Sequence, residues 1–132
     1  MSRAAKRSPV PGPLVLDSSC WLEFFGQTDR LELFRAPILA VEQLIVPVIT
    51  VYEVYKKIHR ELGEDTANEA AALMQCGDVV ELSLPLTLSA ASNGLPLADG
   101  LIYAIAQARG ATLWTQDAHF HGLPGVRYFS KT

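Results

Sequence analysis

The sequence has few cysteines, no long apolar run and no surplus of positive charge. Its only cysteines, Cys20 and Cys76, lie far apart in predicted helices, so they do not form a disulfide framework, and we expect reduced thiols. No apolar run approaches the roughly 18 residues of a membrane span. The first residues lack the apolar core of a secretory signal. These absences predict a cytoplasmic protein with no membrane segment.

Acidic residues outnumber basic ones, 14 to 11, and the formal net charge is −3. This balance argues against broad coating of nucleic acid by a basic surface. It leaves open a nucleic-acid enzyme whose acids gather at a metal site. Residues 1–12 are basic and interrupted by Pro9 and Pro11, which predicts a flexible tail. Residues 13–132 are long enough to form one domain with a sizeable core.

Short apolar runs alternate with helical patterns along the chain. Strands are predicted over 14–16, 44–49, 79–80, 111–114 and 126–129, and helices after Asp17 and over 29–38, 50–62, 66–74, 85–93 and 97–109. This alternation predicts an α/β fold with a mainly parallel sheet of four or five strands. Pro37 predicts a kink or break in its helix. Pro47 indicates an edge strand or a strand end.

Four acids stand at strand exits or helix starts. Asp17, Glu53 and Asp117 follow predicted strands, and Asp99 lies in the first turn of a long helix. Each has a structural alternative. The aspartates can cap or complement helix N-termini, and Glu53 can complete a Thr-x-x-Glu capping box with Thr50.

The chain contains a second copy of this box, Thr66 to Glu69, between two predicted helices. No strand precedes it, so Glu69 is predicted to be structural. Glu53 instead follows a buried strand and is expected to face the crevice where open α/β sheets bind ligands.

Four converging carboxylates repel one another and raise each other's pKa. A divalent cation would relieve this repulsion, and oxygen ligands favour Mg²⁺ or Mn²⁺ over Zn²⁺. His119 and His121 lie on a loop rich in glycine and proline, and we interpret them as surface residues. The side chains of Trp21, Phe24, Phe25 and Phe34 are predicted to form core, with some of them facing a partner.

Four segments resemble, in order, the PIN-domain family: Val15–Ser19, Ile49–Glu53, Leu97–Ala104 and Trp114–Phe120. The subgroup they resemble most is the VapC-type toxin ribonucleases of type II toxin–antitoxin pairs. The ordered set is more specific than any single motif. The resemblance implies a three-layer α/β/α sandwich and an endoribonuclease that depends on Mg²⁺ or Mn²⁺.

The resemblance also implies roles for particular residues. Asp17, Glu53, Asp99 and Asp117 match the four acidic positions of the family, and Thr115 matches a hydroxyl often found beside the last acid. We predict Asp17 and Asp99 as inner metal ligands, with Glu53 and Asp117 acting through water or on a second metal. Gly100 replaces an alanine common in the family, which predicts a looser helix start.

Expected partners are an RNA substrate, an antitoxin that covers the crevice, and a second copy in a homodimer. Lys56, Lys57 and Arg60 follow Glu53 at +3, +4 and +7. They are interpreted either as phosphate-binding residues or as an ordinary solvated helix face with a Glu53–Lys57 pair.

Two other functions remain open. A PIN-like domain can be a non-catalytic scaffold that binds RNA or protein. A response-regulator receiver matches in length and architecture, but it needs paired acids after the first strand, an aspartate after the third and a lysine after the fifth. This chain offers only Glu81 and Lys131 near the last two positions, which makes a receiver a weak alternative.

Overall fold

A computed structural model describes residues 12–131, so all but the last residue of the predicted tail lies outside the described part. Five parallel strands form one sheet in the order β3-β2-β1-β4-β5. The strands are β1 (Leu14–Leu16), β2 (Leu44–Pro47), β3 (Asp78–Val80), β4 (Thr112–Thr115) and β5 (Val126–Tyr128). The predicted α/β fold and parallel sheet are confirmed.

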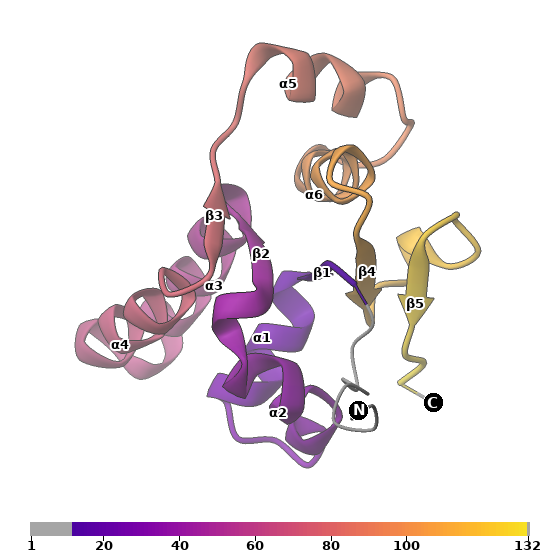
Figure 1. Cartoon of the computed structure of the whole chain (residues 1–132). Coiled ribbons are helices and arrows are strands. Elements are labelled where there is room, and N and C mark those ends of the chain that lie inside the picture. The colour runs from indigo at the N-terminus through magenta and orange to yellow at the C-terminus, as the bar shows by residue number, and fades with distance from the viewer. Residues whose placement is uncertain (1–11, 132) are drawn as a thin grey trace, which may run out of the picture.

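Helices cover both faces of this sheet (Figure 1). They are α1 (Ser18–Phe25), α2 (Leu31–Leu39), α3 (Val48–Leu62), α4 (Glu64–Met74), α5 (Leu84–Ala91) and α6 (Leu97–Ala108), with short 3₁₀ turns at Val41–Gln43 and Ala118–Phe120. None of the helices within 12–131 is long and apolar enough to cross a membrane.

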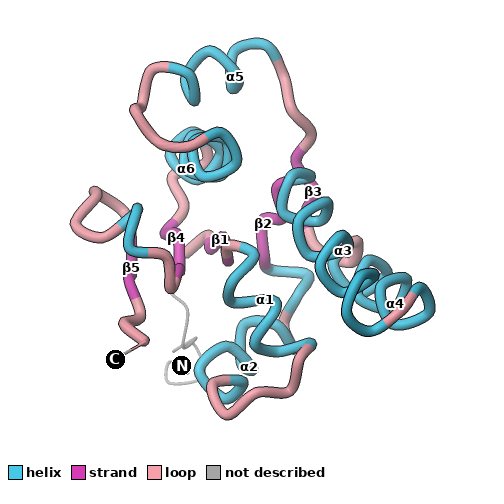
Figure 2. Tube along the Cα trace, turned by 180° about the vertical axis from the view of Figure 1, so that it is seen from behind, coloured by secondary structure: helices cyan, strands magenta, loops and turns pink. Residues whose placement is uncertain are grey.

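The two faces of β1 belong to different halves of the core. Leu14 and Leu16 pack with residues of α1 to α4, whereas Val15 packs with Ile102 and Ile105 of α6. This alternation follows from the two-residue period of a strand, and the sheet therefore lies between two helical layers. Figure 2 shows the same arrangement from behind, with α1 and α2 on one side and α5 and α6 on the other. The three-layer sandwich is confirmed.

The structure agrees only in part with the predictions made for Pro37 and Pro47. Helix α2 continues through Pro37 and ends two residues later, at Leu39. Strand β2 is not an edge, because it pairs with both β1 and β3, but Pro47 is its last residue. Because proline lacks an N–H and holds φ near −65°, it ends the strand, and α3 begins at the next residue, Val48.

Gly100 permits close packing of α5 on α6. A Cβ at this position would lie 3.1 Å from Asn93 Oδ1 and 3.2 Å from the carbonyl oxygen of Ala90. The side-chain amide of Asn93 also donates a 3.0 Å hydrogen bond to the Gly100 carbonyl. This contact lies near the start of α6, on which Asp99 stands. The expected loosening of that helix start stays a prediction.

Candidate active site

The predicted site residues lie at the carboxyl edge of the sheet, where β1 and β4 are neighbours. The chain runs outward from β1 to β2 and β3, and then returns to β4 and β5 on the other side. Such a reversal of strand order is where open α/β sheets place their ligands. Asp17 directly follows β1, and Gln116 and Asp117 directly follow β4.

Asp17 is held from several directions. Its Oδ1 accepts hydrogen bonds from the backbone N–H groups of Ser19 and Cys20, at 3.0 and 3.4 Å, and from Ser19 Oγ at 2.6 Å. Its Oδ2 accepts one from the hydroxyl of Thr115. The side chain is buried, and this burial raises the pKa of Asp17 despite those hydrogen bonds. Capping α1 and serving a functional site are therefore compatible roles for this aspartate.

Thr115 joins two of the acids through hydrogen bonds. Its hydroxyl donates to Asp17 Oδ2 and accepts a 2.9 Å hydrogen bond from the N–H of Asp117. Asp117 in turn caps the 3₁₀ turn that follows, accepting from the N–H of His119 at 2.9 Å. One buried threonine thus fixes the separation of two strand-end acids.

Glu53 is not part of a capping box. Helix α3 begins at Val48 with Pro47 as its N-cap, so Thr50 lies inside the first turn and Glu53 is the sixth helical residue. The buried hydroxyl of Thr50 has no hydrogen-bond partner within residues 12–131. Helix α4 likewise begins at Glu64, so Thr66 is not a cap either. Neither threonine completes a capping box, because the N-caps are Pro47 and Gly63, each three residues before the threonine.

The Glu53 carboxylate instead contacts the site. Partial burial is the main cause that raises its pKa; a hydrogen bond with Ser18 opposes this, and the charges of Asp99, Asp17 and Asp117 raise it further. The carboxylates from β1, α3, α6 and the end of β4 are therefore close enough to repel one another, as expected if they share one crevice.

Asp99, Asp117 and His119 form the tightest group. Each offers a possible ligand atom, and these three atoms lie within 4.8 Å of one another. His119 Nδ1 is 2.9 Å from Asp99 Oδ2 and 3.3 Å from Asp117 Oδ1. The hydrogen bond to Asp99 and the charge of Asp117 raise the pKa of His119, while burial and the nearby Asp117 raise that of Asp99.

His119 is exposed, as predicted for a surface residue, yet it reaches the acids. The sequence analysis missed this contact, although the two-residue spacing from Asp117 was a usable signal. His121 behaves differently, because its ring stacks on Tyr128 with centroids 4.5 Å apart.

These side chains fit a divalent cation. Their donors are predominantly carboxylate oxygens, which suit Mg²⁺ and Mn²⁺. The raised pKa values of Asp17, Glu53 and Asp99 reflect burial and, for Glu53 and Asp99, repulsion by neighbouring acids, which a cation would offset. Asp17 is not in the tight group, and both of its oxygens already accept hydrogen bonds; its assignment as an inner ligand stays a prediction.

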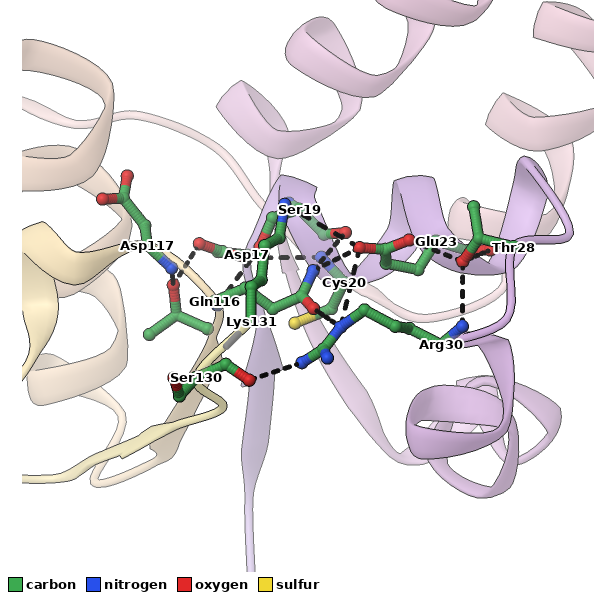
Figure 3. Close-up of polar contacts among 11 residues, drawn as sticks. Asp17, Ser19, Cys20, Glu23, Thr28, Arg30, Gln116, Asp117, Ser130 and Lys131 are labelled. Atoms are coloured by element: carbon green, nitrogen blue, oxygen red, sulfur yellow. Dashed lines mark hydrogen bonds and ion pairs between the residues drawn. The ribbon is translucent and has the colours of Figure 1, made fainter.

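Gln116 is the centre of a second polar network that reaches Asp17 through Ser19 (Figure 3). The sequence did not predict this network. Gln116 is buried; its Oε1 accepts from Arg30 Nε, and its Nε2 donates to Glu23 Oε2 at 2.8 Å. Its backbone N–H donates to Ser19 Oγ at 3.3 Å. Because Ser19 donates to Asp17, this network connects α1, the segment before α2 and the end of β4 to the first acid.

We expect Arg30→Ala to lower both stability and any activity of the site. Arg30 also donates a 3.0 Å hydrogen bond to the carbonyl of Ser130. Its loss leaves Gln116 Oε1 without this donor and leaves Lys131, at 3.9 Å, as the cation beside Glu23. Hydrogen bonds to charged groups contribute about 1.5–3 kcal/mol each, and urea denaturation should show a loss of about that size.

Arg35→Ala is the matched control. Among the ion pairs of residues 12–131, Arg35 takes part only in the exposed pair with Glu32 on the surface of α2. An exposed pair contributes at most about 1 kcal/mol to stability. Equal losses for the two arginine variants would show that the buried network contributes nothing particular.

The predicted basic residues do not share one surface. Lys57 lines a groove beside α1, and Arg60 lies 3.6 Å from Glu61. Lys56 lines a different hollow with Tyr52 on the outer face of α3. The predicted Glu53–Lys57 pair is replaced by a Lys57–Glu61 pair at 3.0 Å.

The aromatic residues of α1 and α2 differ in how deeply they are buried. Trp21 and Phe34 are fully buried, as predicted. Phe24 and Phe25 are half-buried and line a surface hollow of about 520 Å³ that also includes Leu31 and Leu73. Both cysteines are free, Cys20 in the core and Cys76 exposed. Cys76 was predicted to lie in a helix, but α4 ends at Met74.

The fold and site define a three-layer α/β protein with an acidic crevice at the switch point of its sheet. The PIN domain model matches residues 14–126, so the chain belongs to the PIN domain family. No curated protein sequence matches the chain significantly.

Solved structures show the same fold. A toxin–antitoxin complex from Klebsiella pneumoniae has 21% identity and a TM-score of 0.71, with 86% of this chain and 95% of that chain covered. VapC20 of Mycobacterium tuberculosis, described as a toxin that cleaves the sarcin–ricin loop, has 15% identity and a TM-score of 0.71, with 86% and 96% covered. DNA-bound VapBC from Salmonella typhimurium has 15% identity and a TM-score of 0.67, with 89% and 97% covered.

Proposed function

We propose that this PIN domain is a Mg²⁺- or Mn²⁺-dependent endoribonuclease and the toxin of a toxin–antitoxin pair. The observation that carries the proposal is the group of Asp99, Asp117 and His119, whose ligand atoms lie within 4.8 Å of one another, beside Asp17 and Glu53. The similar solved structures include a toxin described as cleaving the sarcin–ricin loop and toxin–antitoxin complexes, which support the choice of substrate and partner.

Asp99 and Asp117 would hold the cation, with Asp17 and Glu53 completing the acidic crevice. A bound Mg²⁺ or Mn²⁺ lowers the pKa of a water molecule and neutralises charge on a phosphodiester. Thr115 keeps Asp17 and Asp117 at a fixed separation through its two hydrogen bonds. Glu53 lies outside the tight group, and burial and its acidic neighbours raise its pKa, so we assign it the role of accepting a proton from water.

The antitoxin would cover the crevice and also contact the surface of α1 and α2. The hollow lined by Phe24 and Phe25 has about 520 Å³ of space, and its walls combine apolar side chains with polar ones such as Gln27 and Glu69. It suits an apolar side chain of a partner flanked by polar contacts. A second copy of the chain is the other proposed partner.

The test is cleavage of a single-stranded RNA by the purified protein. We expect cleavage with Mn²⁺ or Mg²⁺, none with a chelator, and recovery when the metal is restored. Asp99→Asn should remove the activity while keeping the fold, because asparagine is isosteric but carries no charge to balance a cation.

The same pair of proteins tests the toxin assignment. Expressed alone, the wild type should slow bacterial growth and Asp99→Asn should not. A folded protein that binds RNA but never cuts it would support a non-catalytic scaffold instead. Cleavage without growth arrest would leave a PIN nuclease but reject a toxin.

A further inference from the structure

A groove of about 600 Å³ begins beside the acidic crevice and runs between α1 and the second half of α3. We call it the α1–α3 groove. Its polar lining residues are Ser18, Ser19 and Glu23 from α1, Thr28 from the segment after α1, Lys57 and Glu61 from α3, and Lys131 near the C-terminal end. Residues more than a hundred positions apart in the sequence therefore face one space.

The α1–α3 groove is continuous with the crevice through its two serines. Ser18 hydrogen-bonds to Glu53 and lowers the pKa of that carboxyl. Ser19 Oγ donates to Asp17 Oδ1 at 2.6 Å. A polymer with one linkage at the acids can therefore extend directly into this groove.

Two lysines and two glutamates line the groove, so its charge is balanced, in a chain with a net charge of −3. Lys57 Nζ lies 3.0 Å from Glu61, which also pairs with Arg60 at 3.6 Å. Arg60 can therefore keep Glu61 as a partner when Lys57 turns to another anion.

At the other wall, Lys131 Nζ lies 3.9 Å from Glu23. The oxygens of Glu23 are already engaged, Oε1 by the hydroxyl of Thr28 at 2.6 Å and Oε2 by Gln116 at 2.8 Å. Arg30 Nε also lies 3.9 Å from Oε2 of Glu23. Because Glu23 has these other partners, Lys131 can also contact a bound anion.

Lys56 provides a comparison within the same helix. It is adjacent to Lys57 in sequence, but its Nζ lies 5.6 Å from the centroid of the Tyr52 ring, on the outer face of α3. Neighbouring helical residues point about 100° apart, since a turn holds 3.6 residues. Only Lys57 of the two lines the α1–α3 groove.

We propose that the α1–α3 groove binds the RNA strand that flanks the cut, with Lys57 and Lys131 contacting its phosphates. The proposal rests on the proposed function and assigns the path of the substrate on one side of the acids. Two lysines on opposite walls suit a phosphate backbone, because ammonium groups bind phosphate as point charges without demanding a fixed orientation.

Salt-dependent binding tests the proposal. A fluorescent single-stranded RNA is titrated in Mg²⁺ against Glu53→Gln protein, which keeps Asp99, Asp117 and His119 and is expected not to cut. The slope of log K against log salt concentration is negative, and each lost phosphate contact reduces its magnitude by about 0.7 for a single strand. We expect that decrease for Lys57→Ala and for Lys131→Ala, each with several-fold weaker binding, and about twice the decrease for the double variant.

Three further variants serve as controls. Lys56→Ala should leave the slope unchanged, and Lys57→Arg should restore it. Glu61→Gln should strengthen binding, because it releases Lys57 from its carboxylate. An unchanged slope for Lys57→Ala and Lys131→Ala, or an equal decrease for Lys56→Ala, overturns the groove assignment alone. Failure of the parent protein to bind RNA at any salt concentration overturns the proposed function as well.

Discussion

Asp17→Asn is expected to reduce RNA cleavage by more than about 100-fold while leaving the metal-free protein at least as stable at neutral pH. Loss of groups that merely orient metal ligands already costs about 10–100-fold, and this change removes one of the crevice charges. The asparagine keeps an oxygen for the N–H groups of Ser19 and Cys20, so α1 remains capped.

The stability prediction follows from the direction of the pKa shift. Burial raises the pKa of Asp17 in the folded protein above its ordinary value of 3.8. The unfolded state therefore binds fewer protons on this group, and its contribution to stability decreases as pH rises through the interval between the two pKa values. The full penalty is present above the raised pKa and disappears below the ordinary value.

Thermal melts of chelator-treated protein at several pH values measure this effect. The advantage of Asp17→Asn over wild type should be largest near pH 7 and should shrink as the pH falls toward 4. Mn²⁺ should raise the melting temperature of the wild type more than that of the variant. Asp65→Asn, which changes an exposed aspartate in the first turn of α4, should alter neither cleavage nor the response to Mn²⁺.

A variant that loses stability at neutral pH would show that the hydrogen bonds of Asp17 outweigh its desolvation. A variant that cuts RNA at the wild-type rate would remove Asp17 from the site.

Glu53→Gln is expected to reduce cleavage by orders of magnitude with little change in stability, and Glu69→Gln is its matched control. Both glutamates are the sixth residue of a helix and both follow a threonine by three positions. Glu53 lies close enough to the acids for their charges to raise its pKa, whereas Glu69 lies on α4. Since neither is part of a capping box, loss of the carboxylate charge should cost neither helix its cap.

Urea denaturation and initial cleavage rates of the two variants provide the comparison. Glu69→Gln should match the wild type in both measurements. Wild-type cleavage by Glu53→Gln would restrict the functional acids to the three aspartates, whereas equal losses in the two variants would point to a general effect of charge on the protein.

The strand and helix pattern was predictable because the period of apolar residues differs between the two structures. For that reason the sequence correctly predicts a strand at the buried run Leu14–Leu16 and a helix at the stripe of Val51, Val54 and Ile58. The predicted start of α3 was wrong, because Pro47 occupies the N-cap position that was expected for Thr50. Local signals compete within a few residues of a boundary, and periodicity cannot decide between them.

The candidate acids could also be named from the sequence. The carboxyl ends of parallel strands meet at one edge of the sheet, so an acid that follows a strand points toward the others. Asp17, Glu53 and Asp117 were selected on this basis, and Asp99 by its place at the start of an inner helix. Their chemical role remains the subject of the experiments above.

The sequence by itself determined the class of fold and the residue types that gather at the sheet edge, since both depend on local periodicity and on the order of elements along the chain. Only the tertiary structure decided which groups touch. It brought His119 to Asp99, placed Gln116 between Arg30 and Glu23, and put Lys57 and Lys131 on opposite walls of one groove. Such contacts join residues from separate elements, and their distances depend on how helices pack on the sheet, which no local pattern specifies.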